Sequence, residues 1–142
     1  SIRFKNEIVD SDPREQHHRK KLNFGHTIGH ALEGYSLDRN PISHGHAVGI
    51  GMIAESFISY RKSILAEKEW NEIQEKLLAI FPLFDFEKED IPMIIEIMKN
   101  DKKNFNSEIK CCLLQEIGVC LFDQTVTDAE VREALMFLLA IQ

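Results

Sequence analysis

The feature that most constrains this chain is a run in which two glycines and two histidines each recur four residues apart. Residues 22–33 read Leu-Asn-Phe-Gly-His-Thr-Ile-Gly-His-Ala-Leu-Glu. On an α-helix, residues four apart project from one face, so His26 and His30 would stand together and Gly25 and Gly29 would form a smooth strip. Each glycine inside a helix costs about 1 kcal/mol relative to alanine. The run therefore predicts a helix against which another backbone, or a ligand, packs closely.

A second histidine-rich segment follows at residues 43–49, Ser-His-Gly-His-Ala-Val-Gly. Ser43 is a good N-cap, so the segment is expected to open a second helix after a polar loop. His44 and His46 diverge on a helix, so at most one of them should join the first pair. Three protein ligands and an open position are typical of catalytic zinc sites. A metalloprotease pattern is excluded, because it needs glutamate where Thr27 stands. Spacing alone does not decide between a metal site and histidines used only in packing or at helix starts.

The remaining sequence predicts a mainly α domain with one small two-stranded β element near the C-terminal end. Asp12, Pro13 and Glu15 resemble a helix start, and Thr127 with Glu130 forms a second capping box. Pro82 ends an apolar helical stripe. The expected helices span about 12–35, from 43 onward, 67–81, 90–100 and 127–140, and the expected strands span 109–114 and 119–122.

Composition excludes several classes of protein. A net charge of -6 argues against nonspecific nucleic-acid binding. The apolar windows are short and interrupted by charge, so neither a membrane span nor a membrane partner is expected. A cytoplasmic location follows as the default. Buried reduced thiols are expected at Cys111 and Cys112, and a disulfide framework that includes Cys120 is not expected. No strand–glycine loop–helix fingerprint for a dinucleotide is found in the sequence.

The segment from Arg19 to Met52 resembles 3-dehydroquinate synthases. Their pattern is an arginine, two residues, Leu-Asn, one residue, Gly-His-Thr, one residue, Gly-His-Ala, one residue and a glutamate. Every specified position is met between Arg19 and Glu33, and a His-Gly-x-Ala-Val element follows from His44 to Val48. Further family features are matched in order along nearly the whole chain. They are Lys5 with Val9–Asp12, Asp101-Lys102-Lys103, and Ile117-Gly118.

The resemblance implies roles for individual residues. His26 and His44 would ligate zinc or cobalt, and His30 would contact the phosphate end of the substrate. The catalytic group would comprise Lys5, Arg19, Asn23 and His30. Anionic substrate groups would be bound by Lys5, Arg19, Asn23, His30 and one lysine of the pair Lys102 and Lys103. One departure is His46, where the family usually has glutamate. The change is expected to alter the local charge or the residues that surround the ligands, or to allow an adventitious extra ligand.

The family converts 3-deoxy-D-arabino-heptulosonate 7-phosphate to 3-dehydroquinate and phosphate in the shikimate pathway of aromatic amino-acid biosynthesis. This lyase reaction uses NAD, which transiently oxidises a ring hydroxyl, and a divalent metal that polarises oxygens. Three alternatives remain open from the sequence: another NAD-dependent sugar-phosphate cyclase such as an inosose synthase, a metal-dependent alcohol dehydrogenase, and a non-catalytic helical interaction domain.

By the same resemblance, residues 1–142 form a C-terminal metal- and substrate-binding domain. The NAD-binding domain and a third metal ligand, a glutamate, are expected to lie upstream of this chain. The chain by itself is therefore expected to be inactive. The full-length protein is expected to be a homodimer that binds a phosphorylated sugar acid.

Overall fold

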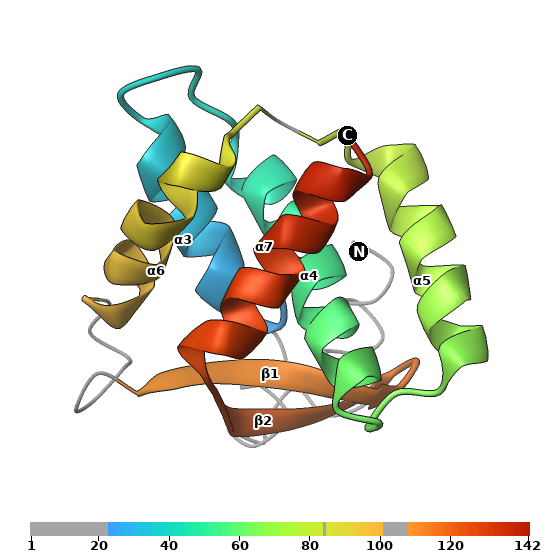
Figure 1. Cartoon of the computed structure of the whole chain (residues 1–142). Coiled ribbons are helices and arrows are strands. Elements are labelled where there is room, and N and C mark those ends of the chain that lie inside the picture. Colours follow the sequence, from blue (N-terminus) through green and yellow to red (C-terminus); the bar gives the residue numbers. More distant parts are fainter. Residues whose placement is uncertain (1–22, 84, 101–107) are drawn as a thin grey trace, which may run out of the picture.

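A computed structural model describes residues 23–83, 85–100 and 108–142 of the chain (Figure 1). This part is mainly α with one antiparallel hairpin near the C-terminal end, which confirms the predicted fold class. The elements are α3 (His26–Ser36), α4 (His44–Arg61), α5 (Glu67–Ile80), the 3-10 helix η2 (Lys88–Asp90), α6 (Ile91–Lys99), β1 (Ile109–Glu116), β2 (Val119–Val126) and α7 (Asp128–Ala140).

Helix α4 is the centre of the domain. Every residue from 47 to 59 is buried, so the helix has no solvent-facing side along most of its length. A helix that is buried all round must be covered by neighbours in several directions. The neighbours are α3, α5, α7 and β1, and Figure 1 shows the hairpin lying across one end of these helices.

The prediction of one helix over residues 12–35 is wrong at Gly25. In the described part of that range, α3 begins at His26, and Gly25 is its N-cap with φ of 84° in the left-handed region. Only glycine adopts this conformation without strain. A side chain at Gly25 would also collide with α4, because its Cβ would lie 2.5 Å from Met52 Cγ and 2.6 Å from the Val48 carbonyl oxygen. Residues 12–22 of the predicted helix lie outside the described residues.

The close packing predicted from the glycine strip is confirmed between α3 and α4. A Cβ placed on Gly29 would lie 2.9 Å from Val48 Cα. A Cβ on Gly51, which faces back from α4, would lie 2.1 Å from the carbonyl oxygen of Gly25. The two backbones are therefore in direct contact, at a separation that no side chain would permit.

The hairpin closes one end of the core. Ile109 pairs with Val126 and Leu114 with Cys120, and Gly118 has φ of 89° between the strands. Both strands are longer than predicted, because backbone pairing continues through polar residues that carry no apolar signal. All three cysteines are free, as expected, and Cys120 is buried along with Cys111 and Cys112.

Helix ends in the described part follow the predicted capping chemistry. Ser43 Oγ accepts the N–H of His46 at 3.1 Å and starts α4. Thr127 Oγ1 accepts the N–H of Glu130 at 3.1 Å, and the Glu130 carboxylate accepts the Thr127 N–H at 2.9 Å. Among the described helices, none has both the length and the apolar character needed to cross a bilayer.

Substitution of Gly51 by alanine tests the backbone contact. We expect G51A to lower the free energy of unfolding by about 3 kcal/mol, since overpacking of a tight interior costs roughly this much. Gly45, in the first turn of the same helix, has no neighbouring atom within 4 Å of a built Cβ, so G45A is the matched control and should leave stability unchanged or slightly raised. Chemical denaturation measures both. Equal stabilities for the two variants would contradict the packing described here.

Candidate metal centre

Three histidines from α3 and α4 converge. His26 is the first residue of α3, His30 lies one turn later, and His44 is the first residue of α4. Their ligand atoms all lie within 4.8 Å of one another, and the ring centroids are 5.3 to 5.5 Å apart. Among the described residues, no other group of three or more histidine, cysteine or acidic side chains converges in this way.

The helix packing explains why residues so far apart in the chain converge. Gly25 lies against Met52, Gly29 lies against Ala47 and Val48, and Glu33 reaches His44, so the helices run past each other in opposite directions. The side chains of His26 and His30 then project from α3 toward the first turn of α4. His44 is exposed there, whereas the other two histidines are half-buried.

Hydrogen bonds orient two of the three rings. His44 Nδ1 lies 3.0 Å from Glu33 Oε1, and His26 Nδ1 lies 3.4 Å from the carbonyl oxygen of Phe24. An oxygen acceptor at Nδ1 requires the proton on that nitrogen, which places the lone pair on Nε2. Carboxylate and carbonyl partners of this kind commonly fix the tautomer of metal-binding histidines.

This donor set fits a divalent transition metal. Neutral imidazole nitrogens suit zinc and cobalt, and three of them leave a position open for substrate or water. His26 and His44, the predicted ligands, lie together. His30, predicted to contact substrate rather than metal, lies equally near both; its spacing of four from His26 was the signal for that proximity.

His46 takes no part in the cluster, in agreement with the prediction that at most one histidine of the second segment would join. Its Nε2 forms a short hydrogen bond with the carbonyl oxygen of Pro82, and its ring stacks on Phe81 with centroids 6.5 Å apart. Phe81 in turn covers Gly49 of α4. In this chain, His46 therefore ties the end of α5 to the start of α4.

Of the remaining predicted site residues, the structure describes only Asn23. Asn23 is exposed and lines a cavity of about 310 Å³ together with Thr27 and Lys110, and the three histidines do not line that cavity. The predicted roles of Lys5, Arg19, Lys102 and Lys103 concern positions outside the described residues.

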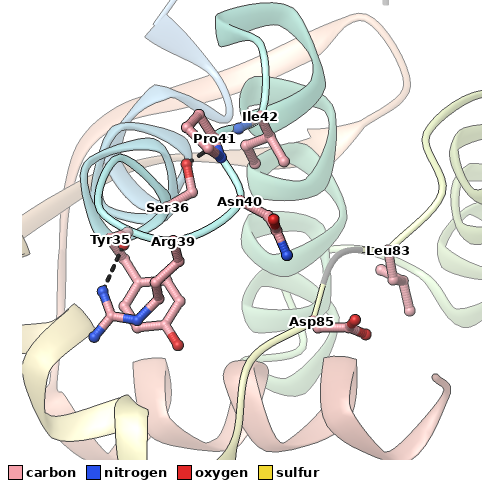
Figure 2. A pocket seen from close by; sticks show the side chains of 8 residues that line it. All are labelled: Tyr35, Ser36, Arg39, Asn40, Pro41, Ile42, Leu83 and Asp85. Atoms are coloured by element: carbon pink, nitrogen blue, oxygen red, sulfur yellow. Dashed lines mark hydrogen bonds between the residues drawn. The ribbon is translucent and has the colours of Figure 1, made fainter.

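A further pocket of about 260 Å³ lies at the C-terminal end of α3 (Figure 2). Arg39 covers the Tyr35 ring at 4.0 Å and donates to the Tyr35 carbonyl oxygen at 2.8 Å. The Tyr35 hydroxyl donates to Asp90 at 2.6 Å, and burial together with this bond raises the pKa of Tyr35 to about 12. Ser36 Oγ is also satisfied, because it donates to the Glu33 carbonyl oxygen and accepts the Ile42 N–H. These polar groups already have partners within the protein.

The metal assignment is tested by alanine substitution within and beside the cluster. We expect H26A and H44A each to weaken Co²⁺ binding by at least about tenfold. Even residues that only hydrogen-bond to a metal ligand typically change the affinity about 10- to 100-fold when they are substituted. H46A is the matched control and should leave the affinity unchanged. Calorimetry and the visible absorption of Co²⁺ measure binding. The site is misplaced if H46A weakens binding as much as H44A does.

Comparison with known proteins agrees with the sequence resemblance. The family described as 3-dehydroquinate synthase C-terminal matches residues 1–104. The chain is 38% identical over 138 residues to a 3-dehydroquinate synthase of Parabacteroides distasonis, covering 96% of this chain and 39% of the relative. It is 35% identical over 145 residues to a pentafunctional AROM polypeptide of Saccharomyces cerevisiae, covering 93% of this chain and 9% of that protein.

Among solved structures, a 2-deoxy-scyllo-inosose synthase complexed with carbaglucose-6-phosphate, NAD⁺ and Co²⁺ superimposes with a TM-score of 0.66 at 25% identity, covering 80% of this chain and 32% of that chain. The present chain spans about two-fifths of the length of the Parabacteroides distasonis 3-dehydroquinate synthase. The motif positions, the helical architecture and the family match agree: this chain belongs to the 3-dehydroquinate synthase family, in its C-terminal region.

Proposed function

We propose that this chain is the metal- and substrate-binding part of an enzyme that converts 3-deoxy-D-arabino-heptulosonate 7-phosphate to 3-dehydroquinate and phosphate, a lyase of the shikimate pathway. The observation that carries the proposal is the convergence of His26, His30 and His44 from the two motifs that mark the family. Relatives named 3-dehydroquinate synthase, at 34 to 43% identity, support this substrate over others.

The cofactors in this proposal are NAD and a zinc or cobalt ion held by His26 and His44. When bound, the ion polarises reacting oxygens of the substrate, while NAD accepts and returns a hydride. A related cyclase has been solved with NAD⁺, Co²⁺ and a sugar-phosphate analogue together. The Glu33 carboxylate accepts a hydrogen bond from Nδ1 of His44, which leaves the lone pair of the neutral ring on Nε2.

His30 holds a proton at the phosphate end of the substrate in this proposal. Its imidazole is half-buried beside the two ligand rings, where it can donate a hydrogen bond to a phosphate oxygen. Lys5, Arg19, Asn23 and one lysine of Lys102 and Lys103 bind the remaining anionic groups. Cations and an amide around the dianionic substrate fix its orientation, and a fixed orientation lowers the barrier of the reaction.

The rest of the catalytic unit is proposed to lie in the part of the relatives that this chain does not span. Within the described residues, the β structure is one antiparallel hairpin, which does not form a dinucleotide-binding unit. We therefore assign NAD binding and a third metal ligand, a glutamate, to that other part. The whole protein is proposed to act as a cytoplasmic homodimer.

A related cyclase activity is the second candidate, because the solved inosose synthase shares this fold at 25% identity. The reaction product separates the two. Release of 3-dehydroquinate by the full-length protein supports the synthase, whereas an inosose formed from a hexose phosphate supports the rival. Net reduction of NAD would instead indicate an alcohol dehydrogenase.

We predict that the full-length protein releases phosphate from the heptulosonate phosphate and that the 142-residue chain alone does not. In the full-length protein, H30N should lower kcat by about 100-fold or more, the range for loss of a general acid or base. H46A should retain most activity, because His46 bonds to Pro82 rather than facing the cluster. Phosphate release and 3-dehydroquinate formation are measured together. Turnover by the isolated chain at the full-length rate would refute the proposal that NAD binding and the third metal ligand lie in another part of the protein.

A further inference from the structure

Glu55 is a carboxylic acid buried at the middle of α4, where an acidic side chain is costly. It is 0% exposed to solvent. Its Oε1 accepts the backbone N–H of Gly25 at 3.0 Å, and its Oε2 accepts that of Ile28 at 3.2 Å. The nearby backbone N–H groups of Thr27 and Cys112 also act to lower the pKa of this carboxyl. A buried carboxyl is tolerated only when its oxygens are satisfied in this way.

These hydrogen bonds converge on the first turn of α3. The first N–H groups of a helix have no acceptor within the helix, and a side chain of the N-cap residue normally supplies one. Here the N-cap is Gly25, which has no side chain, and the first turn of α3 contains no acidic residue. Glu55 therefore caps α3 from the neighbouring helix, at the end where the helix dipole favours an acceptor with negative charge.

The first turn of α3 is also the turn that presents the histidines. His26 lies between Gly25 and Ile28, the two residues that Glu55 holds, and His30 follows one turn later. A loss of these bonds would free the start of α3 to move relative to α4, which carries His44.

We propose that Glu55 is a positioning residue of the metal centre, which fixes the start of α3 against α4 and so holds His26 and His30 beside His44. The inference deepens the proposed metal-dependent function and rests on it. Burial raises the pKa of Glu55 to about 8, while the backbone donors act to lower it. In either protonation state, the carboxyl oxygens remain acceptors for these donors.

The neighbouring residue provides a matched control. Ser56 is also 0% exposed, and its Oγ is the buried side-chain polar atom for which the described structure shows no hydrogen-bond partner. The S56A variant thus changes a buried polar side chain on the same helix without removing a bond. E55Q preserves size but turns an amide NH₂ toward backbone donors, and E55M removes the acceptors while keeping the length of the side chain.

The test has two readouts in the 142-residue chain, after circular dichroism has confirmed that each variant is folded. In the metal-free chain, nuclear Overhauser contacts between the rings of His26, His30 and His44 report their positions directly. With Co²⁺ added, visible absorption reports affinity and ligand geometry. We expect E55Q and E55M to lose the ring contacts and to bind Co²⁺ at least about tenfold more weakly, and S56A to match the unmodified chain.

Folded Glu55 variants that keep the ring contacts and the Co²⁺ affinity would overturn the proposal. If the ring contacts depend on Glu55 but the unmodified chain binds no Co²⁺, the positioning role stands and the metal assignment fails. If neither variant folds, amide hydrogen exchange is measured in the unmodified chain. Protection of the Gly25 and Ile28 amides equal to that of the α4 interior supports the proposed role of Glu55. Free exchange at these two amides refutes it.

Discussion

The direct backbone contact between α3 and α4 is the constraint on which the rest of the structure depends. The absence of side chains at Gly25, Gly29 and Gly51 lets the two helices approach to a distance that no other residue would allow. This approach places the first residue of α4 within reach of the histidine face of α3. A wider separation would still bury apolar surface, but it would leave the imidazoles too far apart to share one ion.

The contact brings polar groups into the interior, and the structure satisfies them across element boundaries. Glu55 accepts hydrogen bonds from the start of α3, while Glu33 bonds to His44. A carboxylate in an apolar interior is stable only where donors surround it, so it specifies the arrangement of the elements that supply those donors. The arrangement of the histidines and the arrangement of the core are therefore coupled physically.

Sequence reasoning found most of the candidate site, because its signals are local. The four-residue spacing of His26 and His30, the capping role of Ser43 and the divergence of His44 from His46 all follow from helix geometry. The break at Gly25 could not be found in this way, because helix-compatible spacing continues through it. Gly25 lies against Met52 and Val48, 27 and 23 residues further along the chain, and a contact over such a separation leaves no local pattern in the sequence.

By itself, the sequence determined the mainly helical class, the capped starts of α4 and α7, the buried thiols, the family and the histidines to consider. These depend on periodicity, on capping chemistry or on a long motif, each of which is complete within a short segment. Only the tertiary structure decided how closely the rings of His26, His30 and His44 approach one another, that His46 bonds to Pro82, and that Glu55 caps a helix to which it does not belong. These are contacts between segments distant in sequence, and their geometry is set by how closely the helices pack rather than by any local pattern.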